Sequence, residues 1–166
     1  MESKLVRVVM PLIPDKAVFQ NSLTSLPLVT YQHGETVIAN GSKTRRLLFL
    51  KKGAVAIVKE GTEIAQVAEP GAVFGELSVL LDQPHTADVR ALETSQFHIA
   101  DAAAFLTQNP IAVLSIATML AHRLDGANHA LIQINHQLQS GEPHRVIVKT
   151  VSTMEGILAV GGAALI

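Results

Sequence analysis

The sequence predicts an α+β protein in which short antiparallel strands are followed by one long helix. Between Leu28 and Phe97, short apolar runs alternate with glycine-containing turns, a pattern typical of an antiparallel barrel or sandwich. At about Asp101 the pattern changes, and apolar residues then recur at helical spacing as far as Leu138. Of the 166 residues, 48% are hydrophobic and 16% are charged, so most of the chain is expected to pack around a core.

Six strands are expected from the positions of these runs and turns. They cover residues 36–39, 47–50, 54–58, 63–67, 88–92 and 95–99. Each of the first four ends close to a glycine, and Asn40-Gly41 is a strong turn signal. Because the strands are short and closely spaced, antiparallel pairing is favoured over a parallel sheet.

A short helical turn over 101–106 precedes the long helix, which begins near Pro110, where a missing N–H costs little. The long helix carries apolar residues at alternating three- and four-residue spacings, as in the seam of a coiled coil. The seam consists of Ala117, Leu120, Leu124, Ala127, Leu131, Ile134 and Leu138. Such a stripe also suits a helix packed on its own domain. We favour a homodimer through residues 111–139, because the seam continues for nearly three heptads past the expected barrel.

Charge and composition exclude several classes of function. Lys and Arg number 13 against 14 Asp and Glu, which does not favour direct binding of nucleic acid. The absence of cysteine excludes disulfides and thiol catalysis. The apolar run 156–166 is far shorter than the roughly 20 residues of a membrane span. We therefore expect a cytoplasmic protein that contacts no membrane.

No catalytic or metal-binding pattern stands out. The sequence has no Gly-x-Ser-x-Gly motif, and we expect no enzyme activity. His122, His129 and His136 recur every seven residues, which separates neighbours by roughly 10.5 Å along a helix, too far to share one ion. They fall opposite the seam, facing solvent. No metal site is expected.

The stretch from Pro70 to Leu81 carries the clearest chemical signal. It contains a turn, a Gly-Glu pair and an apolar run that can form one or two helical turns. Such a junction presents free backbone N–H groups to an anion. Gly75 would allow close approach of a ligand, and Glu76 would accept hydrogen bonds from hydroxyls such as those of ribose. Gly-Glu before an apolar run is common, so this pattern alone does not decide the function.

The wider set of motifs is more specific. It comprises Gly34-Glu35, Gly53-Ala54, Gly71, Phe74-Gly75-Glu76-Leu77 and Pro84-His85-Thr86-Ala87. Their order and spacing resemble those of cyclic-nucleotide-binding domains over about Leu26 to Leu138, most closely at 70–91. The resemblance implies an antiparallel β-roll, similar to a double-stranded jelly roll, with a short phosphate-cassette helix and a C-terminal dimerisation helix. It also implies a sensor that couples occupancy by cAMP or cGMP to helix rearrangement, without another cofactor.

The resemblance also implies which residues bind the ligand. They are Gly75, Glu76, Leu77, His85, Thr86 and Asn128. Glu76 would bind the ribose 2′-OH, Thr86 would help to hold the phosphate, and Asn128 lies near positions that contact adenine. Where the family normally has an arginine, this chain has His85, whose imidazole is mostly neutral near its ordinary pKa of roughly 6.5. Binding is therefore expected to be weakened or lost, and a dimeric scaffold without a nucleotide is the alternative.

The chain divides into four expected parts. They are an N-terminal segment 1–25, the β-roll 26–110, the dimerisation helix 111–139 and an extension 140–166 with a strand and an apolar tail. Related regulators of the catabolite-activator type continue into a DNA-binding domain, for which the extension is too short. We expect a stand-alone sensor or a fragment of a longer protein, with a tail suited to an unknown protein partner.

Overall fold

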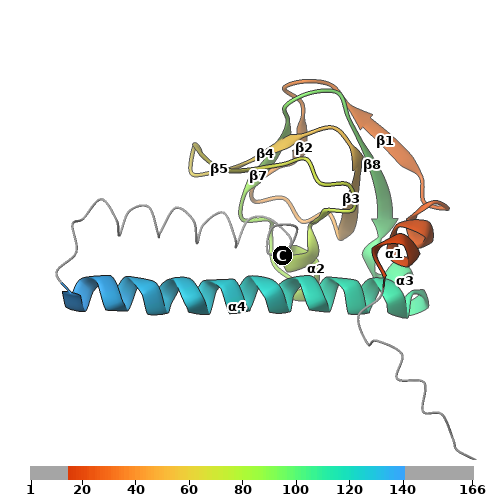
Figure 1. The fold of residues 1–166 in the computed structure, drawn as a ribbon. Coiled ribbons are helices and arrows are strands. Elements are labelled where there is room, and N and C mark those ends of the chain that lie inside the picture. The colour runs from red at the N-terminus through yellow and green to blue at the C-terminus, as the bar shows by residue number, and fades with distance from the viewer. Residues whose placement is uncertain (1–14, 141–166) are drawn as a thin grey trace, which may run out of the picture.

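The structure, a computed structural model, describes residues 15–140, and within them the strands form two four-stranded antiparallel sheets (Figure 1). The first sheet has the order β1-β8-β3-β6, and the second has the order β2-β7-β4-β5. The strands are β1 Leu28–Tyr31, β2 Thr36–Ile38, β3 Arg46–Lys52, β4 Val55–Lys59, β5 Thr62–Val67, β6 Val73–Phe74, β7 Asp88–Ala91 and β8 Ser95–Asp101. The predicted antiparallel β-roll is confirmed.

Strand β3 shows why the sheets and helices pack as they do. Its side chains alternate between the two faces of the sheet, and Leu47 to Leu50 are all buried. Leu48 and Leu50 enter the core between the sheets, while Leu47 and Phe49 enter a second core on the opposite face. A strand buried on both faces needs a continuous apolar run, which is the sequence of β3.

The core between the sheets is built mainly from aliphatic side chains. Its buried members are Ile38, Leu48, Leu50, Val55, Ile57, Val67, Ala72, Phe74, Val89 and Phe97. The Phe97 ring is central, because it meets Phe74 with ring centroids 5.9 Å apart and Tyr31 at 5.7 Å. Both contacts are edge-to-face, a favoured arrangement of aromatic rings.

The second core lies under the helices. Helix α1 (Lys16–Leu23), helix α3 (Ala102–Gln108) and the first turns of α4 (Pro110–Ser140) cover the outer face of β3 (Figure 1). Asp15 caps α1 by accepting from the Ala17 amide at 2.8 Å. Residues 1–25 carried no helix in the prediction from sequence, so α1 is an addition. Its anchors are Phe19 and Leu23, four residues apart, which both reach this core.

Helix α4 confirms the predicted long helix and shows how its apolar residues divide. The buried residues of the helix are Ala112, Ile116, Arg123, Gly126, Ala127 and Ala130. In the predicted seam, Leu124, Leu131 and Leu138 are instead 62%, 48% and 61% exposed. Leu120 packs on the second core, so the domain itself uses this residue of the seam, and Ala127 is also buried.

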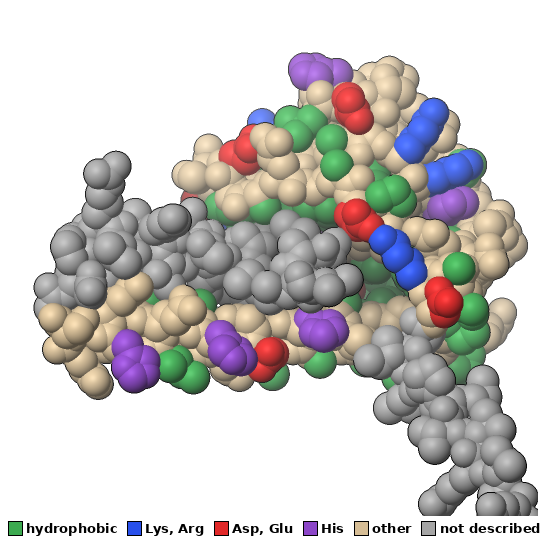
Figure 2. Space-filling model, in the orientation of Figure 1, with side chains coloured by type: hydrophobic (Ala, Val, Ile, Leu, Met, Phe, Trp, Pro, Cys, Tyr) green, Lys and Arg blue, Asp and Glu red, His purple; other side chains and the backbone are tan. Residues whose placement is uncertain are grey.

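The three histidines of α4 lie on the solvent side, as predicted. His122, His129 and His136 are all exposed. Figure 2 shows histidine side chains spaced along one face of the helix. Within residues 15–140, no three His, Asp or Glu side chains are grouped so as to hold a metal ion.

Two further observations concern the ends of the chain and membranes. The expected strand and apolar tail of 140–166 fall, after Ser140, outside the described residues, as does most of the segment 1–25. Within the described range, no single helix is both long and apolar enough to cross a membrane. Helices α3 and α4 reach that length and apolarity only when taken together across a bend of 105°.

Candidate functional site

The predicted cassette forms a tight junction between strand β6 and helix α2 (Glu76–Leu80). Gly75 caps α2 with a φ of +91°, in the left-handed region that suits glycine. A Cβ atom at this position would lie 2.6 Å from the carbonyl oxygen of Arg46 and 3.4 Å from Cε1 of His85. Only glycine therefore fits between β3 and the loop that carries His85.

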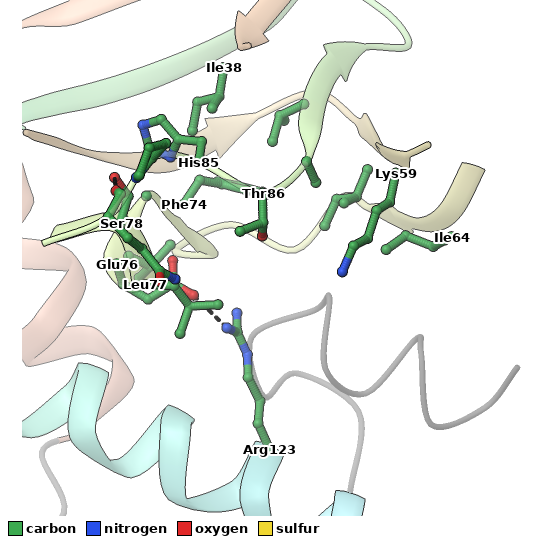
Figure 3. A pocket seen from close by; sticks show the side chains of 17 residues that line it. Ile38, Lys59, Ile64, Phe74, Glu76, Leu77, Ser78, His85, Thr86 and Arg123 are labelled. Atoms are coloured by element: carbon green, nitrogen blue, oxygen red, sulfur yellow. Dashed lines mark hydrogen bonds and ion pairs between the residues drawn. The ribbon is translucent and has the colours of Figure 1, made fainter. Parts of the chain in front are cut away.

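A cavity of about 400 Å³ opens beside this junction (Figure 3). That volume lies within the range of small-molecule sites. Strands β2, β4, β5, β6 and β7, helix α2 and helix α4 all contribute to its lining. Five of the residues implied by the resemblance line it together: Gly75, Glu76, Leu77, His85 and Thr86. Asn128 is exposed on α4 and is not part of the lining.

Arg123 is the residue by which α4 reaches the cavity. Its Nη1 lies 2.5 Å from Oε1 of Glu76, and the two side chains are only 7% and 6% exposed. The contact joins the cassette to the long helix and neutralises a buried carboxylate. Removing one partner of a buried ion pair is strongly destabilising, so the two residues act as a unit.

His85 is held in place by the loop that follows β2. Its backbone N–H donates to the Ser42 carbonyl at 2.8 Å, and its carbonyl accepts from the Gly41 amide at 2.8 Å. Its ring Nε2 lies 3.1 Å from Oγ1 of Thr44. Burial lowers the pKa of His85 below its usual 6.5, an effect that the nearby Glu76 carboxylate partly offsets. The imidazole is therefore mostly neutral at pH 7.

The comparisons with known proteins agree with this geometry. The family model described as the cyclic nucleotide-binding domain matches residues 28–108. Residues 28–108 belong to the cyclic nucleotide-binding domain family. The domain thus covers all eight strands, α2 and α3, and the match ends just before α4.

Two sequence relatives place the domain within much longer proteins. The chain is 27% identical over 126 residues to potassium/sodium hyperpolarization-activated cyclic nucleotide-gated channel 4 of Oryctolagus cuniculus, covering 72% of this chain and 11% of that protein. It is 30% identical over 64 residues to the cAMP-dependent protein kinase regulatory subunit of Debaryomyces hansenii, covering 39% of this chain and 14% of the subunit. The chain therefore spans about a tenth of the length of the channel.

A solved structure shows the same fold over a larger share of the chain. The crystal structure of Thermus thermophilus catabolite activator protein matches with a TM-score of 0.57 at 19% identity. The match covers 90% of this chain and 84% of that one. At this level of identity the likeness concerns the fold, including the long helix that follows the cyclic nucleotide-binding domain.

The charges around the cavity of the domain suit an anion. Among the residues that the structure describes, its lining contains two cationic side chains, Lys59 and Arg123, and one carboxylate, Glu76. With His85 neutral, these described residues carry a formal charge of +1. A phosphodiester carries one negative charge, so the cavity is complementary to it in sign.

An ion pair also holds the segment that follows helix α2. Lys43 lies 2.7 Å from the Asp82 carboxylate and donates to the Asp82 carbonyl at 2.8 Å. This contact lowers the pKa of Asp82. The Ser78 hydroxyl donates to the Gln83 carbonyl at 2.5 Å. The loop after β2 and the end of α2 thus hold His85 and Thr86 against the cavity.

Sequence reasoning missed Arg123 and Lys59, although each left a signal. Arg123 shares the helix face of Ala112, Ile116 and Ala130, so a charge there breaks an otherwise apolar stripe. Charged residues on an inward face are rarely buried without a partner. Lys59 ends a strand whose preceding alternate residues, Val55 and Ile57, point into the core. Because side chains alternate between the two faces of a strand, Lys59 lies on the same face of β4 as Val55 and Ile57. This alternation would have placed Lys59 at the cavity.

Proposed function

We propose that this chain is a non-catalytic regulatory module that binds a 3′,5′-cyclic nucleotide and transmits its occupancy to α4. The observation that carries the proposal is the Glu76–Arg123 ion pair, which brings the cassette and the long helix to one cavity. Membership of residues 28–108 in the cyclic nucleotide-binding domain family supports it. So does the net positive charge of the cavity lining.

In this proposal the cyclic phosphate binds at the cassette end of the cavity, near Gly75, His85 and Thr86. The Thr86 hydroxyl donates to a phosphate oxygen, and Glu76 accepts from the ribose 2′-OH. Arg123 supplies the permanent positive charge that the neutral imidazole of His85 lacks. The base then extends toward β4 and β5, where Ile57 and Ile64 line the cavity.

Coupling to α4 follows from competition at Glu76. Arg123 now contacts Oε1 of Glu76, so a ribose hydroxyl that donates to this oxygen competes with Arg123 for it. Ligand binding would therefore change the contact between the cassette and α4 and favour another position of the helix. A ligand shifts such an equilibrium only by its differential affinity for the two states.

We further propose that a second copy of this chain covers the exposed apolar strip of α4. Leu124, Leu131 and Leu138 recur every seven residues and are each about half exposed or more. This spacing suits a parallel coiled coil of two α4 helices. In such a homodimer, the paired α4 helices would connect two cyclic-nucleotide sites.

His85 favours one second candidate, a dimeric scaffold without a nucleotide. The family's usual arginine is replaced, and the imidazole already contacts Thr44. Losing a charge-assisted hydrogen bond costs about 1.5–3 kcal/mol. If Arg123 did not supply the missing charge, the cavity would bind a cyclic nucleotide too weakly to sense it.

Titration calorimetry with cAMP and cGMP tests the proposed function. The wild type should bind at least one of them, and Glu76→Ala should weaken that binding about ten- to a hundredfold by removing a charged acceptor. Glu93→Ala, at an exposed loop position outside the cavity, is the matched control and should bind like the wild type. Thermal unfolding confirms that each variant is folded.

Two results would count against the proposal in different ways. No heat for the wild type with either nucleotide, and none for His85→Arg, would favour the scaffold. Unchanged affinity in folded Glu76→Ala would mean that the ribose does not bind at Glu76.

A further inference from the structure

Lys59 gives the cavity a cationic group far from the cassette. It is the last residue of β4, pairs across the hairpin with Thr62 of β5, and lines the cavity while remaining exposed. In Figure 3, Lys59 and Ile64 lie at the opposite end of the cavity from His85 and Ser78. The described residues therefore give the cavity two cationic positions, one facing the cassette and one at the β4–β5 hairpin.

The hairpin end has the surfaces that a flat heterocycle requires. Ile57, Ile64 and Val89 line the cavity there with aliphatic side chains. Lys59 lies at the same end, and its ammonium forms no ion pair or hydrogen bond with any residue between 15 and 140. A base that packs on the isoleucines would present its polar edge to that ammonium.

Asn128 lies outside the lining of this cavity. The sequence placed it near the base, but it is exposed on α4 and absent from the lining. An asparagine can donate and accept and so can match the edge of adenine, whereas a lysine ammonium has three donors and no acceptor. Among the described residues, the charged side chain at the base end is thus Lys59, which can only donate.

We infer that Lys59 selects a 6-oxopurine cyclic nucleotide over an adenine one, and this inference rests on the proposed function. The N7 and O6 atoms of guanine are both acceptors, whereas adenine presents the N7 acceptor beside the N6 amino donor. An ammonium can donate to both atoms of guanine. Against adenine it gains one acceptor and meets a donor. Hypoxanthine keeps N7 and O6, so cIMP should be recognised in the same way.

The ratio of two affinities isolates this effect from general attraction. The charge of Lys59 attracts any cyclic phosphate, so its removal weakens cAMP and cGMP together. Only a contact with the base edge changes the ratio of their dissociation constants. Because Lys59 is exposed, solvent screens the contact, and we expect a change in that ratio of about three- to tenfold.

Calorimetry of the full chain with cAMP, cGMP and cIMP tests the inference in wild type, Lys59→Met and Lys52→Met. Lys52 is an exposed lysine of β3 outside the cavity lining, which makes it the matched control. We expect the preference for cGMP over cAMP, measured as the ratio of their dissociation constants, to be about three- to tenfold smaller in Lys59→Met than in the wild type. The affinity for cIMP should change as that for cGMP does. Lys52→Met should retain the wild-type preference.

Each outcome of this experiment has one meaning. Binding of the nucleotides with the same cGMP-to-cAMP ratio in wild type and Lys59→Met would overturn the role of Lys59 and leave the proposed function standing. A lost preference for cGMP that cIMP does not share would assign the selectivity to the guanine 2-amino group and overturn recognition of O6. No binding of any of the three nucleotides to the wild type would overturn the proposed function and this inference with it.

Discussion

Replacing Arg123 with methionine should destabilise the fold strongly, because it leaves the Glu76 carboxylate buried beside an apolar side chain. The two side chains are 7% and 6% exposed and lie 2.5 Å apart, so water screens them little. Removing one partner of such a pair typically costs about 3–5 kcal/mol. We expect a loss near 3 kcal/mol, at the lower end, since the cavity beside Glu76 can admit water.

Urea unfolding at pH 7 followed by circular dichroism measures this loss. The matched control is Arg90→Met, which breaks an exposed pair with Asp88 at 3.3 Å and should cost less than about 1 kcal/mol. The double variant Arg123→Met/Glu76→Gln removes both charges and should lose less than the sum of the single losses. Equal stability of Arg123→Met and wild type, or additive losses in the double variant, would refute the structural role given to the pair.

The remaining predictions concern the long helix and His85. Leu124→Glu combined with Leu131→Glu should give a monomer by sedimentation equilibrium, because both side chains lie on the exposed strip, and a persistent dimer would place the interface elsewhere. Burial lowers the pKa of His85 below 6.5, so the unfolded chain takes up its proton first, and stability should fall as the pH drops from 6.5 toward the lower folded pKa. A bound anion favours the charged ring, so nucleotide affinity should instead rise as the pH falls, and level off below the lowered pKa of His85 in the free folded chain. His85→Arg should tighten binding and flatten its pH dependence, and a pH dependence that persists in this variant would assign it to another group.

Much of the fold could be predicted because its signals are local. The turns at Gly53 and Gly61 have positive φ and separate strands that overlap the expected ones, although β3 is longer than expected and β6, after Gly71, was not expected. The break at Asp101 also lies where β8 ends and α3 begins. Helix α1 could not be found in this way, because only Phe19 and Leu23 are buried and the core that holds them is formed by distant residues.

The site could be predicted only as far as the cassette. Gly75, Glu76 and Leu77 lie next to one another in the chain, and the loop with His85 and Thr86 follows closely, so one motif identifies them all. The contributions of α4 and β4 depend on how the elements pack.

Arg123 and Asn128 illustrate that limit. They lie five residues apart on one helix, and only the packing of α4 against the roll decides that Arg123 reaches the cavity. The fate of His85 likewise depends on Thr44, a residue of a loop 41 positions earlier. Sequence alone could say that the usual arginine is missing, but not that another arginine lies in the same cavity.

Thermal unfolding of the full chain with and without cyclic nucleotide tests the central claim most directly. A ligand present at a hundred times its dissociation constant stabilises the folded state by about 2.7 kcal/mol, which corresponds to a rise in Tm of roughly 5–11 °C for a domain of this size. The proposed function predicts such a rise with cGMP or cAMP and none with 5′-GMP or 5′-AMP at equal concentration. An unchanged Tm up to millimolar concentrations of both cyclic nucleotides would contradict it.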